Sequence, residues 1–291
     1  MPDVILASCA AAAGRDEDEP LLLPALAGAG IGATAADWAD PAVDWAAADA
    51  VVVRSTWDYA LRRAEFLAWA RRVEAATLLL NQADVLAWNT DKRYLAELEA
   101  SGVPVVPTAW AEDGAALDAA LGRWDSDVVV KPTVSAGARD TARFGPDVRG
   151  DAAVLGAAVL ASGRTVMVQP YLDRVDDEGE TGLVYLDGVL SHAFRKGALL
   201  AGAALGPGLY AEEEITPRTA TADQRAVGDA VLAAAEERLH RVPLYARVDL
   251  VPGADGAPVL MELELTEPSL FLATDPAAAG RVAAAIAARL A

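Results

Sequence analysis

Residues 50–53, Ala-Val-Val-Val, form an uninterrupted apolar run rich in β-branched side chains. A strand with one face in water alternates polar and apolar residues, so this run indicates a strand that is covered on both faces. Shorter apolar runs at residues 4–7 and 78–80 predict two more strands, and helical patterns at 20–30 and 61–75 lie between them. Because strands that alternate with helices are typical of open α/β sheets, we expect such a layer near the N-terminus.

The remaining sequence predicts a mixture of helices and antiparallel strands. Asn89 or Thr90 is expected to cap a helix over residues 91–100. The Asp-Gly dipeptides at 187–188 and 255–256 each separate two apolar runs, which is a strong signal of a β-hairpin. We therefore expect an α/β and α+β chain of three units: an N-terminal α/β domain over residues 1–86, a central subdomain over 87–170 and a C-terminal subdomain over 171–291.

The charge balance limits the partners of the chain. With 24 Lys and Arg against 43 Asp and Glu, the formal net charge is −19, which repels nucleic-acid phosphates and anionic membranes. The single cysteine excludes a disulfide framework within one chain, and the apolar N-terminal stretch lacks the basic residues of a signal peptide. We expect a cytoplasmic protein that binds a small molecule and has no nucleic-acid or membrane partner, and homo-oligomer formation stays open.

Three acidic residues predict a metal site in the second hairpin. Asp249 lies on one strand, and Glu262 and Glu264 lie two residues apart on the other, so their side chains share one face. Carboxylates on one face repel one another unless a cation lies between them, and oxygen ligands favour Mg²⁺. The alternative is a solvated acidic strand whose carboxylates pair with Arg247.

Lys131 ends an apolar strand and precedes a loop of small residues that includes Ser135 and Gly137. Backbone N–H groups of such loops can approach phosphate oxygens. A surface hairpin loop fits the same pattern, and Lys92, early in its helix, fits an ordinary solvated lysine. No Gly-x-Gly-x-x-Gly follows the first strand, and no Gly-x-Ser-x-Gly occurs, which argues against a nicotinamide dehydrogenase and a serine hydrolase.

In their order along the chain, these motifs resemble the ATP-grasp superfamily of ligases over essentially the whole sequence. The resemblance implies an ATP-grasp fold, in which an N-terminal open α/β domain precedes two α+β subdomains that clamp ATP. It also implies a reaction in which ATP and Mg²⁺ convert a substrate carboxylate into an acyl phosphate. An amine nitrogen then captures the acyl group, with release of ADP and phosphate, and catalysis works by positioning and electrostatics.

The resemblance also assigns roles to individual residues. Lys92 and Lys131 would hold the ATP phosphates beneath the loop with Ser135 and Gly137, and Arg247 would stabilise charge on the acyl phosphate. The expected metal ligands are Asp249, Glu262 and Glu264, with Glu267 as an alternative because Glu264 stands where the family usually has asparagine. The expected adenosine contacts are Gln169, Tyr171, Leu172 and Asp173, with the backbone of Tyr171 and Leu172 at the adenine and Asp173 at the ribose.

Residues 54–59, Arg-Ser-Thr-Trp-Asp-Tyr, follow the buried strand at its carboxyl end, where the ligands of open α/β sheets gather. Together with segments 88–92 and 262–268, they resemble the ATP-grasp branch that includes the O-ureido-serine cyclo-ligases of cycloserine biosynthesis. The Gly-rich stretch 201–210 is either a lid over the site or an exposed loop. The expected contacts to a small-molecule carboxylate substrate are Arg54, Ser55, Thr56, Asp58, Arg195 and Lys196.

Two alternatives stay open. The first keeps the reaction but joins two molecules, as an amino-acid or peptide ligase does, and it needs room for a second substrate. The second is a nucleotide-binding protein without catalysis. The charged residues expected of an active site are all present, which favours an enzyme: Lys92, Lys131, Arg247, Asp249, Glu262 and Glu264.

Overall fold

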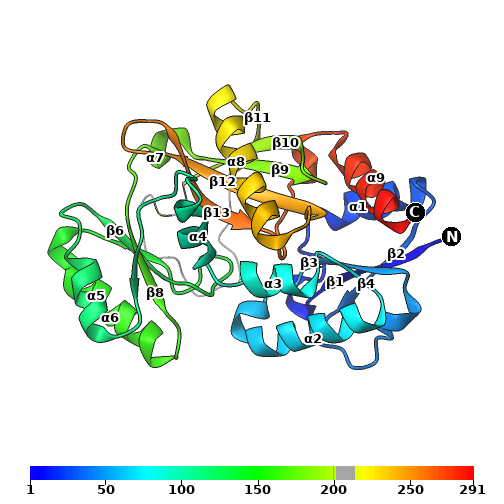
Figure 1. The fold of residues 1–291 in the computed structure, drawn as a ribbon, viewed down its shortest axis with the longest axis horizontal. Helices are drawn as coiled ribbons and strands as arrows, with labels where there is room; N and C mark the ends of the chain where they lie inside the picture. The colour runs from blue at the N-terminus through cyan, green and yellow to red at the C-terminus, as the bar shows by residue number, and fades with distance from the viewer. Residues whose placement is uncertain (199, 201–213) are drawn as a thin grey trace.

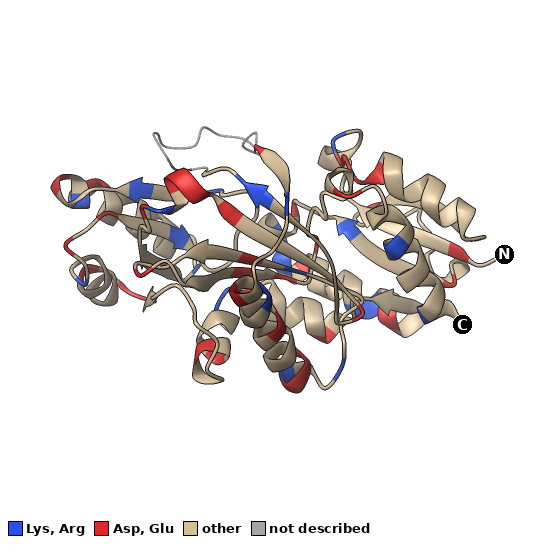
Figure 2. Cartoon of the chain, turned by 90° about the horizontal axis from the view of Figure 1, so that it is seen from above, with Lys and Arg blue, Asp and Glu red and all other residues tan. Residues whose placement is uncertain are grey.

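The computed structural model describes residues 1–198, 200 and 214–291, and within these residues the strands form three sheets. Figure 1 shows the N-terminal sheet at one end of the molecule, a second sheet at the other end and a third between them. Among the described helices, none has the length and apolar character that crossing a membrane requires. Figure 2 shows acidic residues, in red, on helices and loops along the whole molecule.

The strands of the N-terminal sheet run parallel, in the order β2 (Gly32–Asp37), β1 (Asp3–Ser8), β3 (Ala50–Ser55) and β4 (Leu78–Leu80). Every residue of β3 is buried, as its apolar run predicts. Val51 and Val53 pack on the side of α2 (Arg63–Ala76), whereas Ala50 and Val52 pack on the side of α1 (Glu19–Gly28). The open α/β layer expected from the sequence is therefore confirmed.

The central sheet is antiparallel, and one of its faces is covered by helices. Its order is β5 (Ala109–Ala111), β8 (Val166–Pro170), β6 (Val128–Pro132) and β7 (Ala142–Phe144). Helices α5 (Gly114–Leu121) and α6 (Arg149–Ala161) share a core with one face of β6 and β8. The opposite face is left for other contacts.

The third sheet is also antiparallel and lies in the middle of the molecule. Its order is β11 (Ile215–Arg218), β10 (Val189–Lys196), β9 (Glu180–Leu186), β12 (Tyr245–Pro252) and β13 (Pro258–Glu264). Helices α8 (Ala222–Leu239) and α4 (Tyr94–Ala100) contribute to the core beneath this sheet, and the short α7 (Val175–Glu178) precedes β9. Both hairpins predicted from the Asp-Gly dipeptides are present.

Two helices pack against elements that are distant from them in the sequence. α9 (Ala278–Leu290) at the C-terminus packs against α1, and both chain termini lie at the same end of the molecule (Figure 1). α4 shares its core with α8, although it was assigned to the central unit. The unit boundaries at residues 86 and 170 therefore stay a prediction.

The helix expected to be capped at Asn89 or Thr90 differs in the structure. α3 (Ala83–Asn89) ends at Asn89, and α4 begins only at Tyr94. Neither residue is the N-cap of α4, because that position belongs to Arg93. The side chain of Asn89 instead makes long-range contacts with β13.

Candidate functional site

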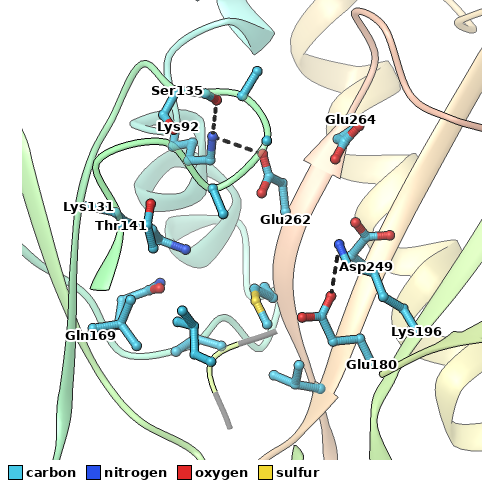
Figure 3. A pocket seen from close by; sticks show the side chains of 18 of the residues that line it. Lys92, Lys131, Ser135, Thr141, Gln169, Glu180, Lys196, Asp249, Glu262 and Glu264 are labelled. Carbon is cyan, nitrogen blue, oxygen red and sulfur yellow. Dashed lines mark hydrogen bonds and ion pairs between the residues drawn. The ribbon is translucent and has the colours of Figure 1, made fainter. Parts of the chain in front are cut away.

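A cavity lies between the uncovered face of the central sheet and the third sheet (Figure 3). Alternation along β6 places Val128 and Val130 in the core with α5 and α6, and leaves Val129 and Lys131 lining the cavity. The third sheet contributes lining residues from β9, β10, β12 and β13, which gives the cavity most of its charged groups. The charged residues that line the cavity, from all elements together, are Lys92, Lys131, Glu180, Lys196, Arg247, Asp249, Glu262, Glu264 and Glu267.

Lys92 links the small-residue loop to the acidic strand. Its Nζ donates to the carbonyl oxygen of Ser135 across 2.9 Å and lies 3.0 Å from Oε1 of Glu262 (Figure 3). Burial lowers the pKa of Lys92, but the charge and hydrogen bond of Glu262, together with the charges of Glu264 and Glu267, bring the pKa above its ordinary value. Lys92 is therefore buried as a charged, paired group and is not the ordinary solvated lysine that its sequence context also fits.

Lys131 faces the same cavity but lacks such a partner. Within the described residues its ammonium group makes no hydrogen bond or ion pair. Burial lowers its pKa to about 8, against the opposing charge of Glu262 and with the help of the nearby charge of Lys92. Lys131 is half-buried, and a partly desolvated cation without an anion is costly, so this position favours binding of an anionic ligand.

Arg247 lies between two of the three carboxylates expected to bind metal. Its guanidinium donates to both carboxylate oxygens of Asp249 at 2.9 to 3.1 Å and also to Glu264. Asp249 lies opposite Glu262, and Arg247 lies opposite Glu264, in the register of β12 and β13. The pairing with Arg247 that the sequence left as an alternative is therefore present.

The expected three-carboxylate cluster does not form in this arrangement. Within the described part of the chain, no three His, Cys, Asp or Glu side chains converge on a point that could hold a metal ion. The reason is that Lys92 attracts Glu262, while Arg247 holds Asp249 and Glu264. A metal ion at this place would have to share the carboxylates with these cations.

One end of the cavity, which we call the acidic end, is lined by Asp249, Glu262, Glu264 and Glu267. Its carboxylates outnumber the nearby cations. Burial raises the pKa of Glu264 to about 7, with further contributions from the charges of Glu262 and Asp249. Burial, followed by the charge of Glu264, raises the pKa of Glu267 well above its usual range. Burial raises the pKa of Glu262, but the charges of Lys92, Lys131 and Arg247 and the hydrogen bond from Lys92 together bring it below its ordinary value. Such an excess favours a bound cation.

The segment after β3 places different side chains in the cavity than the sequence suggested. Trp57 and Tyr59 line it. The predicted contacts Arg54, Ser55, Thr56 and Asp58 do not line it.

Hydrogen bonds or burial hold each of these four side chains away from the cavity. Arg54 is 3% exposed and donates to Asp18 and to the carbonyl oxygen of Pro268, both at 3.1 Å. The Ser55 hydroxyl lies 2.8 Å from that of Ser8, and Thr56 is fully buried. Asp58 accepts hydrogen bonds from the Trp38 indole at 2.7 Å and from Arg62 at 2.8 Å.

The predicted pair Arg195 and Lys196 is divided by strand alternation. Lys196 lines the cavity, 3.6 Å from a carboxylate oxygen of Glu180 (Figure 3). Arg195 points the other way and donates to the carbonyl oxygens of Asp177 and Glu178. Only Lys196 is therefore placed to meet a ligand in the cavity.

The end of β8 and the residues after it, 169–172, which we call the hinge residues, line the apolar part of the cavity. Gln169, Tyr171 and Leu172 are lining residues, and they lie beside an apolar cluster that includes Val106, Val129, Val175 and Val251. The Tyr171 N–H already donates to the Asp127 carbonyl at 2.8 Å, so it is not available to a ligand as expected. Asp173 lies outside the lining with its side chain 82% exposed, which argues against the expected ribose contact.

The small-residue loop also lines the cavity, through Ser135, Gly137 and Thr141. Gly137 has a φ of +62°, which a residue without a β-carbon adopts readily. The suggested lid at residues 201–210 lies outside the described residues. Sequence reasoning missed Glu180, Trp57 and Tyr59 as lining residues. Strand alternation could not have identified Trp57 and Tyr59, because β3 ends at Ser55.

Comparisons with known proteins agree with this geometry. The family model for the N-terminal domain of D-cycloserine synthetase DcsG matches residues 4–81. The cycloserine biosynthesis protein DcsG of Streptomyces lavendulae is 44% identical over 285 residues, which is 94% of this chain and 94% of that protein.

Solved structures give the same picture. The crystal structure of D-cycloserine synthetase DcsG is 42% identical, has a TM-score of 0.92 and covers 99% of this chain and 100% of its own. The RimK-domain ATP-grasp protein of Sphaerobacter thermophilus is 20% identical with a TM-score of 0.70, covering 98% of each chain. The second likeness shows a shared fold, and the first extends to sequence.

Proposed function

The chain belongs to the DcsG family of ATP-grasp ligases, and we propose that it closes O-ureido-D-serine to D-cycloserine by joining the substrate's activated carboxylate to its own nitrogen. As an ATP-dependent ligase it forms a C–N bond and releases ADP and phosphate. The particular substrate is suggested by the DcsG relatives at 44% and 42% identity. The rest of this proposal concerns which residues carry each part of the reaction.

The unpaired ammonium of Lys131 is the observation that carries the proposal. It lies in the cavity with Lys92 and the loop of Ser135 and Gly137. A triphosphate at this position would supply the anion that Lys131 lacks, and loop N–H groups would donate to its oxygens. We assign Lys92 and Lys131 to the phosphates of ATP, with Lys131 also next to the phosphoryl group that is transferred.

The acidic end suits Mg²⁺ in its donor chemistry. All its candidate ligands are carboxylate oxygens. A divalent cation would offset their excess negative charge. We assign the ion to Asp249, Glu262 and Glu264, which would share it with phosphate oxygens. When bound, Mg²⁺ supplies positive charge that offsets the negative charge of the phosphates.

The adenine is assigned to the apolar side of the cavity. Val106, Val129 and Val251 belong to the buried cluster there, beside the hinge residues. Since the Tyr171 N–H is already used, the Leu172 backbone is the better candidate to bind the base edge. Gln169 lies next to it and donates its amide to the Thr108 hydroxyl at 2.9 Å.

Arg247 is assigned to the substrate carboxylate as it becomes an acyl phosphate. Its guanidinium is oriented by Asp249, by Glu264 and by the Ser269 carbonyl at 2.9 Å. A cation fixed in this way stabilises charge that develops on the transferred group without reorganising during the reaction. Because the attacking nitrogen belongs to the same molecule, no second substrate pocket is required.

The test is ADP release with Mg²⁺, measured with and without O-ureido-D-serine, beside a Glu262→Gln variant. We expect ADP release that depends on the substrate and accompanies a cyclic product, and we expect the variant to lose both. Product formation from two separate amino acids would instead support an intermolecular ligase. ADP binding without turnover on any amino acid would support a nucleotide-binding protein.

A further inference from the structure

Glu267 is a cavity carboxylate to which the proposed function gives no role. Its residue is 8% exposed, it lines the cavity, and within the described residues it makes no hydrogen bond or ion pair. The other acidic residues assigned above are each held by Lys92 or Arg247. An isolated carboxylate at this depth is costly, so a cation from a ligand is expected beside it.

The position of Glu267 is fixed by contacts on both sides of it in the chain. The Tyr245 hydroxyl lies 2.9 Å from the Thr266 carbonyl and 2.6 Å from the Val53 carbonyl. Arg54 donates to the carbonyl of Pro268. The segment around Glu267 therefore runs beside the end of β3, from which residues 54–59 continue.

Two aromatic side chains of that segment share the cavity with Glu267. Trp57 is 8% and Tyr59 is 5% exposed, and both belong to one packed cluster while lining the cavity. After burial, the charge of Glu267 is the largest influence that raises the pKa of Tyr59, ahead of Glu262 and Glu264. Of these three carboxylates, Glu267 thus has the strongest electrostatic contact with Tyr59.

We propose that Glu267, Trp57 and Tyr59 form the subsite for the ammonium group of an α-amino-acid substrate. A carboxylate beside aromatic rings suits an alkylammonium, which gains both a charge-assisted hydrogen bond and cation–π attraction. A hydrated Mg²⁺ ion would gain little from the rings, because it takes oxygen ligands. The inference rests on the proposed function and names the class of its substrate: an acid with a free amine next to the reacting carboxyl group.

The decisive comparison is Glu267→Gln against the wild-type protein, with two substrates. The variant keeps the size of the side chain and removes its charge. We expect KM for O-ureido-D-serine to rise about 10- to 100-fold, the usual effect of losing a hydrogen bond to a charged group. KM for ATP and the Mg²⁺ concentration for half-maximal rate should stay within about twofold.

The desamino analogue of the substrate gives a second readout. Wild-type protein should prefer the amino compound over this analogue in kcat/KM by a similar factor, and Glu267→Gln should lose that preference. Glu99→Gln, at an exposed position on α4, serves as the matched control. Tyr59→Leu should raise KM for the amino compound more than Tyr59→Phe, because the ring rather than the hydroxyl contacts the cation.

The outcomes separate this inference from the proposed function. If the wild-type protein forms the cyclic product and Glu267→Gln changes the Mg²⁺ requirement but not KM for the amino acid, Glu267 is a metal ligand and the inference is wrong. An unchanged preference between the two substrates would overturn it as well. If the wild-type protein forms no product from any amino acid, the proposed function fails, and the inference fails with it.

Discussion

Asn89 donates its side-chain amide to the carbonyl of Leu263 across 2.7 Å, although 174 residues separate the two in the chain. Its Oδ1 accepts from the N–H of Leu265 at 2.7 Å and from the Thr266 hydroxyl at 3.1 Å. β13 is the last strand of its sheet, so Asn89 supplies the hydrogen bonds that a further strand would make. Because Leu263 lies between Glu262 and Glu264, this contact fixes the backbone that carries both carboxylates.

Replacing Asn89 should therefore affect both stability and the proposed Mg²⁺ site. Asn89→Ala leaves buried backbone groups of β13 without partners, at about 1–3 kcal/mol for each group. We expect a lower melting temperature and a Mg²⁺ concentration for half-maximal rate that rises by about tenfold or more, since about 1.4 kcal/mol of lost binding energy is tenfold. Thermal unfolding and Mg²⁺ titration of ADP release measure the two effects.

Asn81→Ala is the matched control for Asn89. Asn81 is also buried and bonds the backbone of Leu244, Tyr245 and Leu265, but it does not bond Leu263, which lies between Glu262 and Glu264. It should lower the melting temperature to a similar extent and shift the Mg²⁺ requirement much less. Equal shifts in both variants would mean that Asn89 contributes only to stability.

Lys131 should limit stability in the absence of ligand and support activity in its presence. Lys131→Met removes a half-buried ammonium without a partner among the described residues, so we expect an equal or higher melting temperature without ATP. With ATP, the rate of ADP release should fall by about 100-fold or more, because a donor to the transferred phosphoryl group is lost. A large loss of stability in the ligand-free variant would show that the Lys131 ammonium group has a stabilising partner, which would contradict this interpretation.

The pH dependence of this stability difference has a definite sign. In the folded chain the pKa of Lys131 is lowered to about 8 by burial, whereas an unfolded lysine keeps its proton up to about pH 10.4. Between these values the unfolded chain binds more protons, so wild-type stability gains from rising pH. The advantage of Lys131→Met in melting temperature should therefore shrink from pH 8 to pH 10.

His192 should make the protein less stable in mild acid. Its Nε2 donates to the Leu270 carbonyl at 2.7 Å, and burial lowers the pKa of the imidazole below its ordinary 6.5. On acidification the unfolded chain takes up the proton first, so this stability is present above about pH 6.5 and is lost below it, at up to about 1.4 kcal/mol per pH unit. His192→Gln should flatten the dependence of unfolding free energy on pH between 7.5 and 5.5.

Local patterns predicted much of this site. The apolar run of β3 indicated burial on both faces, and the Asp-Gly dipeptide predicted the hairpin that carries Asp249 and Glu262, which the structure places opposite each other. Alternation along β6 places Lys131 on the cavity face, and such alternation can be read directly from the sequence. What sequence could not reveal is which distant group a polar side chain meets. Arg54 was expected to contact substrate, and its partner proved to be Asp18 on another segment.

Arg54 and Asp18 form a buried ion pair that should act on structure rather than on substrate binding. Besides Arg54, Asp18 accepts from the N–H groups of Leu270 and Leu272, at 2.6 and 2.7 Å. Arg54→Met leaves the Asp18 carboxylate buried with one partner fewer, which typically costs about 3–5 kcal/mol. We expect a large fall in melting temperature.

Kinetics at a temperature where the Arg54→Met variant is folded then distinguish the two roles. If Arg54 is structural, KM for the amino-acid substrate should stay within about threefold of wild type, because the cavity lining itself is unchanged. If Arg54 binds the substrate carboxylate, as its sequence context suggested, KM should instead rise by about 10- to 100-fold. Asp18→Asn distinguishes the two roles further. It weakens the same ion pair, so it should destabilise the protein if Arg54 is structural. It removes no group that would bind a substrate carboxylate.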